Sequence, residues 1–186
     1  LIIVKQTLPD GSPQTFDFSL DGGALNSPIT DGGQLILNPA PGQHSLNETV
    51  PDGWDLTAIV CDDQSVQTNP AARPNLNFTL TGAGVTITCT FTNTQRGTVI
   101  IEKQTLPDGS PTTFTFSGAV NGNIGDSQQL SAILPSGNYT VSETVPADWD
   151  LTAIVCDDAN SGILQGATAS INLEVGETVT CTFTNT

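Results

Sequence analysis

The only two lysines of this 186-residue chain occupy the same position in two copies of a repeat. Lys5 follows Leu1 and Ile3 at alternate positions of an apolar segment, and Lys103 stands in the same pattern. Alternate side chains of a β-strand lie on one face, so both lysines are expected to point into a core. Burying an ammonium group is costly unless a partner offsets its charge or a reaction removes it. The fold must therefore supply each lysine with such a partner.

Three segments recur without change and divide the chain into two domains. They are KQTLPDGSP (5–13 and 103–111), WDLTAIVCDD (54–63 and 149–158) and TCTFTNT (88–94 and 180–186). The differences in length fall in the polar segments between them, which is typical of loops that join strands. We predict one domain at residues 1–95 and a second at residues 96–186, each near the common size of a domain with its own core.

Alternating apolar and polar residues in each repeat predict short strands, and Pro-Asp-Gly and Asp-Gly-Gly turns separate them. The inward-facing sets include Phe16 and Phe18, then Leu76, Phe78 and Leu80, and a closing series of Val85, Ile87, Cys89, Phe91 and Asn93. Stretches typical of long helices are absent. The expected fold is therefore all-β, with two tandem antiparallel, immunoglobulin-like β-sandwich domains of about seven strands each.

The charge of the chain excludes several classes of partner. It has 19 acidic and 4 basic residues and a net charge of −15. Such a field repels nucleic acids and anionic membranes, so we expect neither as a partner. No segment approaches the roughly 18 apolar residues of a transmembrane helix, so no membrane insertion is expected here. Neither a phosphate-binding loop nor an EF-hand occurs, and we predict no cofactor and no metal.

Each repeat contains two cysteines, Cys61 and Cys89 in the first and Cys156 and Cys181 in the second. Their spacing is long and no CxxC motif occurs, which argues against zinc or redox sites. Two cysteines at matching positions of each domain predict one disulfide bond within each repeat. Such bonds persist in oxidising compartments, so we expect the protein to be extracellular or exposed at a cell surface.

A lysine, a glutamate and an asparagine recur on inward-facing positions of both repeats. The lysine lies in the first strand, the glutamate in a middle strand and the asparagine in the last strand. The two predicted triads are Lys5, Glu48 and Asn93, and Lys103, Glu143 and Asn185. The first and last strands of a sandwich are commonly neighbours, so the lysine and the asparagine are expected to lie close together.

The motifs around these triads resemble the B-type repeat domains of bacterial surface adhesins and pilins. They are an opening V-x-I-x-K strand, a G-x-Y-x-V-x-E-T-x-P-x-x-W segment that includes Glu143, and a closing F-T-N strand. The resemblance covers both repeats almost end to end and implies a prealbumin-like, or transthyretin-like, sandwich. One departure is His44, which stands where the second repeat has Tyr139.

The resemblance also implies a covalent crosslink within each domain. In many members of that family, the lysine and the asparagine join in an isopeptide bond with loss of ammonia, while the glutamate moves the proton. Burial would support this chemistry because it favours a neutral amine and a protonated carboxyl. The alternative is a buried Lys–Glu ion pair with the asparagine hydrogen-bonded beside it.

Other sequence marks point to the surface. Asn47, Asn77 and Asn138 each begin an N-x-[ST] sequon and are expected to point away from the core, so they are glycosylation candidates and glycans are candidate partners. The acidic pairs 62–63 and 157–158 are expected to be solvated loop carboxylates rather than calcium ligands. The single histidine, His44, cannot supply a catalytic triad to both repeats, and we predict that the protein is not an enzyme.

Taken together, these features predict an extracellular structural subunit of a fibre, pilus or stalk. We expect head-to-tail assembly with other copies of the chain into a homopolymer, by strand addition or exchange. The residues expected to make the polymer contact are Leu1, Ile2, Ile3 and Val4. The alternative function is an adhesin repeat module that binds carbohydrate or a host protein.

Overall fold

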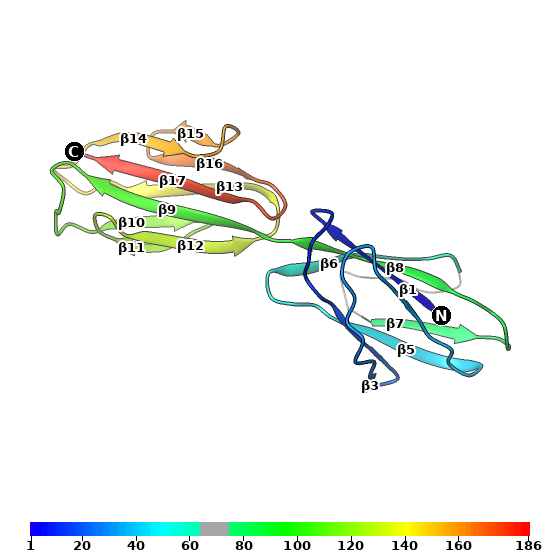
Figure 1. The fold of residues 1–186 in the computed structure, drawn as a ribbon. Coiled ribbons are helices and arrows are strands. Elements are labelled where there is room, and N and C mark those ends of the chain that lie inside the picture. Colours follow the sequence, from blue (N-terminus) through cyan, green and yellow to red (C-terminus); the bar gives the residue numbers. More distant parts are fainter. Residues whose placement is uncertain (64–74) are drawn as a thin grey trace. The chain divides into compact units, whose positions relative to one another are not determined.

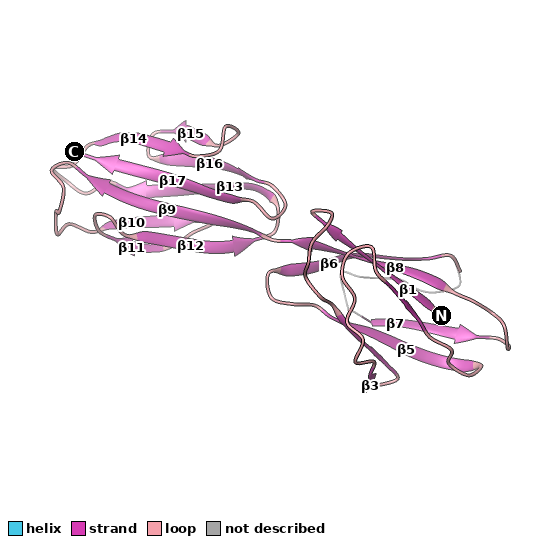
Figure 2. Ribbon diagram, viewed as in Figure 1, coloured by secondary structure: helices cyan, strands magenta, loops and turns pink. Residues whose placement is uncertain are grey.

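The structure is a computed structural model that describes residues 1–63 and 75–186. The chain divides into two compact units, Leu1–Gln95 and Arg96–Thr186. All regular structure in the described residues is β-strand, so no helix there could cross a membrane (Figures 1 and 2). The prediction of two all-β sandwich domains is confirmed.

The first unit contains two four-stranded sheets among its described residues. One has the strand order β4-β1-β8-β6 and the other the order β3-β2-β5-β7. The strands are β1 (Ile2–Leu8), β2 (Asp17–Leu20), β3 (Gly23–Ala24), β4 (Gln34–Ile36), β5 (Gly42–Thr49), β6 (Trp54–Cys61), β7 (Asn75–Leu80) and β8 (Thr88–Gln95).

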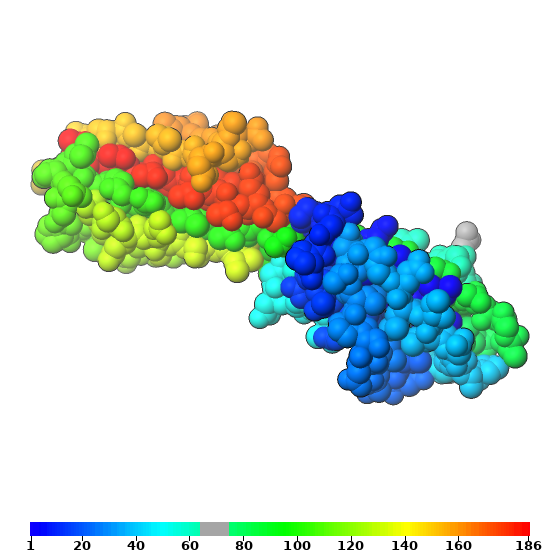
Figure 3. Space-filling view, viewed as in Figure 1, coloured from blue at the N-terminus to red at the C-terminus, as the bar shows by residue number. Residues whose placement is uncertain are grey.

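The second unit repeats this plan with one strand, β15, beyond those in the described residues of the first unit. Its sheets have the orders β12-β9-β17-β14 and β11-β10-β13-β16-β15. The strands are β9 (Gly97–Thr105), β10 (Phe114–Gly118), β11 (Gly122–Ile124), β12 (Gln129–Leu134), β13 (Gly137–Thr144), β14 (Leu151–Cys156), β15 (Gly162–Gln165), β16 (Thr168–Leu173) and β17 (Thr178–Asn185). The space-filling view shows β12, β9, β17 and β14 as neighbouring bands of side chains at the surface of this unit (Figure 3).

The first and last strands of each repeat lie side by side, as expected, and they run parallel. β1 pairs with β8, and β9 with β17, whereas the other strand pairs of both units are antiparallel. A parallel pair needs a long crossover connection, and here the whole repeat supplies it.

The polymer contact predicted for Leu1, Ile2, Ile3 and Val4 stays a prediction, but these residues do not form an open strand edge. β1 pairs with β4 on one side and with β8 on the other. Leu1 and Ile3 are also buried in the core. These residues can join another chain only if β1 leaves its own sheet.

Alternation of side chains builds the core between the two sheets of each unit. Phe16 meets Trp54 and Phe18 meets Phe91 edge to face, with ring centroids 5.4 and 5.2 Å apart. The same two contacts recur in the second repeat, where Trp149 takes the place of Trp54. Burying one such side chain contributes about 1.5–3 kcal/mol. Val85, expected to face this core, is exposed instead because β8 begins only at Thr88.

Candidate crosslink sites

Lys5, Glu48 and Asn93 come together inside the first unit, and the two sheets both contribute. Lys5 lies on β1 and Asn93 on β8 of one sheet, while Glu48 lies on β5 of the facing sheet. The Lys5 Nζ atom donates hydrogen bonds to Asn93 Oδ1 at 2.7 Å, Phe91 O at 3.0 Å and Gln6 O at 2.7 Å. It lies 3.5 Å from Glu48 Oε1.

The second unit repeats this arrangement almost atom for atom. Lys103 Nζ donates to Asn185 Oδ1 at 2.8 Å and lies 3.6 Å from Glu143 Oε1. It also donates to the carbonyls of Phe183 at 2.9 Å and of Gln104 at 2.7 Å. Both lysine side chains are fully buried, so the sequence pattern located two equivalent sites.

Strand register explains why the lysine reaches the asparagine. Across the parallel pair, Lys5 faces Phe91 and Thr7 faces Asn93. Side chains at alternate positions share a face, so Lys5 and Asn93 both point inward and lie diagonally across the pair. The lysine side chain extends along β8 and places its amine beside the carboxamide.

Opposing effects act on the charge of each lysine. The ring of Phe16 lies 4.2 Å from Lys5 Nζ, and that of Phe114 lies 4.2 Å from Lys103 Nζ, and both contacts favour the charged amine. Burial lowers the pKa of both lysines, although the neighbouring glutamates oppose the change. Burial likewise raises the pKa of Glu48 and Glu143, against the opposing effect of the lysines. Proton transfer from lysine to glutamate therefore becomes less unfavourable than in water.

Several polar atoms at these sites have no hydrogen-bond partner among the described residues. They are both carboxylate oxygens of Glu48 and of Glu143, and the Nδ2 atoms of Asn93 and Asn185. Leaving such groups buried and unpaired is expensive. The carboxamide nitrogen of each asparagine is also the group that would depart if the lysine amine attacked Cγ.

The four cysteines form two disulfides, one in each unit. The Cys61–Cys89 bond joins β6 to β8 and the Cys156–Cys181 bond joins β14 to β17. In each pair the two cysteines face each other directly across antiparallel strands.

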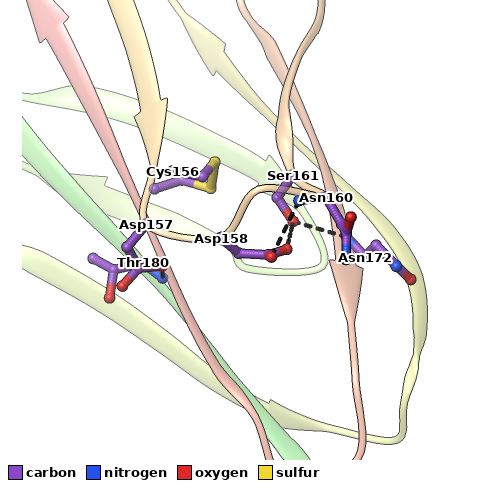
Figure 4. The surroundings of a disulfide bond; sticks show 8 residues. Cys156, Asp157, Asp158, Asn160, Ser161, Asn172 and Thr180 are labelled. Atoms are coloured by element: carbon purple, nitrogen blue, oxygen red, sulfur yellow. Dashed lines mark hydrogen bonds between the residues drawn. A yellow bond between two sulfur atoms is a disulfide. The ribbon is translucent and has the colours of Figure 1, made fainter.

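The aspartates that follow these cysteines bind backbone rather than standing free. Asp62 Oδ1 accepts from Thr88 N at 2.9 Å, and Asp157 Oδ1 accepts from Thr180 N at 2.8 Å. Figure 4 shows the second disulfide with Asp158, whose carboxylate accepts from Ser161 Oγ at 2.7 Å. These carboxylates tie the turn after β14 to the neighbouring strands.

His44 and Tyr139 occupy equivalent strand positions and make the same hydrogen bond. His44 Nε2 lies 2.7 Å from Ala40 O, and the Tyr139 hydroxyl donates to Pro135 O at 2.7 Å. His44 Nδ1 also lies 2.8 Å from Asp21 Oδ2. Both partners of the imidazole accept hydrogen bonds, so the doubly protonated ring fits this position, and the hydrogen bond with Asp21 raises the pKa of His44.

Two aspartates that support the lysine strands were not identified from the sequence. Asp31 accepts from the backbone nitrogens of Thr7 at 2.6 Å and Gly11 at 2.8 Å. Asp126 repeats both bonds in the second unit, and these bonds, led by the one from Gly109, lower the pKa of Asp126 to about 2. The sequences around Asp31 and Asp126 differ between the two repeats. The only sequence signal that the two positions are equivalent is an aspartate at the end of a polar turn in both.

The sequon asparagines lie on strands away from the core. Asn77 and Asn138 are exposed, and Asn47 is half-buried. Their use as glycan sites stays a prediction.

Comparisons with known proteins place the fold. A family model described as a prealbumin-like fold domain matches residues 1–95 and again residues 99–186. No curated protein sequence matches the chain.

Among solved structures, the chain is similar to the major pilin from Streptococcus pyogenes (14% identity, TM-score 0.38), with 100% of this chain and 96% of the pilin covered. It is also similar to a Mobiluncus mulieris adhesin containing intramolecular disulfide, isopeptide and ester crosslinks (10%, TM-score 0.42; 79% and 60% covered). The chain is also similar to the Bacillus anthracis TIE protein (19% identity, TM-score 0.37), with 100% of this chain and 33% of the TIE protein covered. Such low identities concern the fold alone.

Proposed function

We propose, from the premise that this chain belongs to the family of prealbumin-like fold domains, that it is an extracellular structural subunit whose domains are crosslinked internally to resist tension. Two observations support an extracytoplasmic setting: a disulfide bond in each domain and a net charge of −15. Disulfides persist in oxidising compartments, and the negative charge favours solubility.

The observation that carries the proposal is the duplicated triad. In both repeats a buried lysine amine lies within 2.8 Å of an asparagine carboxamide oxygen, with a buried glutamate beside it. A buried ion pair alone seldom adds net stability, because desolvation of the two charges offsets their attraction. Joining the lysine to the asparagine would remove the buried charge and release the carboxamide nitrogen that has no partner.

The reaction is an acyl transfer that consumes no oxidant. The neutral Lys5 amine attacks Cγ of Asn93, while the protonated Glu48 hydrogen-bonds to the carboxamide oxygen and stabilises its developing negative charge. A C–N bond forms, the bond from Cγ to Nδ2 breaks, and Nδ2 leaves as ammonia with the proton that the amine gives up. Glu48 carries that proton between the two nitrogens. Lys103, Glu143 and Asn185 perform the same steps.

The proposed bonds would shorten the path along which force travels. A bond from Lys5 to Asn93 joins the first strand to the last, so force applied at the ends of the first unit passes through the bond. Residues 6–92 and, in the second unit, residues 104–184 then carry no load. Both sandwiches would stay folded while a chain of such units is stretched.

The finer part of the proposal is head-to-tail assembly of many copies into a fibre. Contacts between unlike surfaces generate open filaments when the rotation from one copy to the next does not close a ring. Because β1 is enclosed, strand addition would use an outer strand such as β6 or β14. Each of these strands carries an exposed valine, Val60 or Val155. Sedimentation of the purified chain over a range of concentrations tests this part, and a monomer at every concentration would refute it.

Single-molecule stretching tests the tensile role. The chain is pulled by its two ends between folded protein handles whose unfolding forces and unfolded lengths are known. The proposal predicts no unfolding step from residues 6–92 or 104–184 at forces that unfold the handles. Asn93→Ala restores an unfolding step for the first unit alone, and Asn185→Ala for the second alone. Wild-type extension equal to that of the double variant would overturn the proposal.

A further inference from the structure

We propose that the two disulfides are register locks that position Asn93 and Asn185 for attack by Lys5 and Lys103, an inference that rests on the crosslinking reaction proposed above. In this account the cysteines do not touch the reacting atoms. They are positioning residues that fix the strand carrying the asparagine before the amide bond forms.

β8 carries both groups on its inward face. Cys89, Phe91 and Asn93 occupy alternate positions, and Cys89 is joined to Cys61 directly across the β6–β8 pair. β17 presents Cys181, Phe183 and Asn185 in the same order, with Cys181 joined to Cys156. The disulfide therefore holds each asparagine-bearing strand four residues before the reactive side chain.

The outward face of β8 does not define its register. Threonine occupies every position on that face, so a shift of the strand by two residues places one threonine where another stood over most of the strand. The outward residues are Thr88, Thr90, Thr92 and Thr94. Such a slip moves the strand by about 7 Å and carries Asn93 out of reach of Lys5.

The ladder between β6 and β8 is also irregular beside Asn93. Leu56 faces Asn93 and Ala58 faces Thr92, so an extra residue of β6 bulges at this point. A bulge locally disrupts the ladder. The same irregularity lies opposite Asn185 in the second unit. On the β6 side, pairing alone therefore specifies the register weakly at the asparagine end of the strand, although the ladder with β1 is continuous there.

Locking β8 to β6 also fixes β8 relative to the lysine. Trp54, at the start of β6, packs edge to face on Phe16, and the Phe16 ring lies 4.2 Å from Lys5 Nζ. In the second unit, Trp149 packs on Phe114, whose ring lies 4.2 Å from Lys103 Nζ. In the first unit, β6 thus both holds the asparagine-bearing strand through the disulfide and contacts the surroundings of the amine; in the second unit, Trp149 makes the same contact from two residues before β14.

A tensile role does not explain the disulfides once the amide bonds exist. Cys61 and Cys89 both lie within the segment that a Lys5–Asn93 bond would remove from the load path. A force applied at the chain ends would not reach them. The disulfides are therefore expected to act before the crosslink forms, during folding, when the pairing register of the strands is established.

The proposed sequence has two steps: oxidation of the cysteines to the disulfide, then formation of the amide bond without any change of oxidation state. Two thiols lose two protons and two electrons to a disulfide oxidant, for which oxidised glutathione serves in the test tube. The amine then attacks the carboxamide and ammonia leaves. Oxidation thereby controls when the permanent bond can form.

The test uses the double variant C61A/C89A in the full chain, with the unchanged second repeat as an internal control. Cell-free synthesis in a glutathione buffer is stopped at intervals, and peptide mapping gives the crosslinked fraction of each repeat. We expect the Lys5–Asn93 bond to form about tenfold or more slowly than in the wild type, with the Lys103–Asn185 rate unchanged. Equal rates in the two repeats of the variant would overturn the inference.

A second variant separates register from general stability. Leu76 is fully buried on β7 of the other sheet, and L76A destabilises the same unit without changing a residue of β6 or β8. We expect L76A to crosslink at nearly the wild-type rate, and a slowing as large as that of C61A/C89A would contradict register locking. If C61A/C89A does not fold, wild-type chain made with and without a thiol reductant gives the same comparison. Absence of crosslinks in fully oxidised wild type would instead refute the crosslinking reaction itself.

Discussion

Substituting Asn93 by alanine removes the proposed crosslink while leaving the lysine and the glutamate in place. Lys5 and Asn93 are 88 residues apart in the sequence. In the chain-entropy model, a crosslink that closes a loop of this length stabilises a domain by about 4.6 kcal/mol. In the crosslinked domain the lysine nitrogen is already an amide, so no separate hydrogen bond to a charged amine is lost; without the crosslink, the substitution would remove only such a hydrogen bond, about 1.5–3 kcal/mol. We therefore expect Asn93→Ala to lower the free energy of unfolding of the first unit by about 4.6 kcal/mol.

Tryptophan fluorescence during denaturation by guanidinium measures this effect. The chain has two tryptophans, one per unit, so a Trp149→Phe background makes Trp54 the reporter of the first unit. The matched control is Asn185→Ala, which should leave the Trp54 transition unchanged. A loss of only about 1.5–3 kcal/mol would equal the hydrogen bond alone and would refute the covalent account of this site.

Three further substitutions test other parts of the structure. The hydrogen bond with Asp21 raises the pKa of His44. The stabilisation of the first unit by this pair is therefore complete below about pH 6.5 and is lost as the pH rises through the folded pKa. His44→Tyr should remove this pH dependence from thermal melts of the first unit. The pKa of Asp126 is lowered to about 2. The stabilisation that its carboxylate gives the second unit is therefore present above about pH 4 and is lost as the pH falls towards 2. In calorimetry, Asp126→Asn should reduce the loss of stability of the second unit between about pH 4 and about pH 2. Leu46 is fully buried, so Leu46→Ala should cost the first unit about 2–5 kcal/mol in denaturant titrations, and a loss below 1 kcal/mol would contradict the described core.

The sequence predicted the parts of the fold that depend on side-chain alternation. Lys5, Glu48 and Asn93 each share a face with apolar residues, and that pattern alone indicated burial on strands. The cysteine pairs followed from their equivalent positions in two repeats. In each case the signal was local to one strand or was repeated in the second domain.

Features that depend on pairing between distant segments were missed or mistaken. The sequence of β1 does not reveal that β4 and β8 enclose it, so the sequence alone could not show that a polymer contact at Leu1–Val4 requires β1 to leave its sheet. The hydrogen bonds from Thr7 and Gly11 to Asp31 join the end of β1 and the turn after it to a distant loop, and no periodic pattern records such a contact. Val85 fits the alternating pattern of β8 but lies before Thr88, where that strand begins.

The mass of the intact, purified chain tests the central claim most directly. The native protein is reduced, denatured and enzymatically deglycosylated before measurement, and the Glu48→Gln/Glu143→Gln double variant serves as the control. The account predicts a wild-type mass lower than the sequence mass by two molecules of ammonia, with a variant mass that shows no such loss. A wild-type mass equal to the sequence mass would contradict the account and would leave each lysine in a buried ion pair with its glutamate.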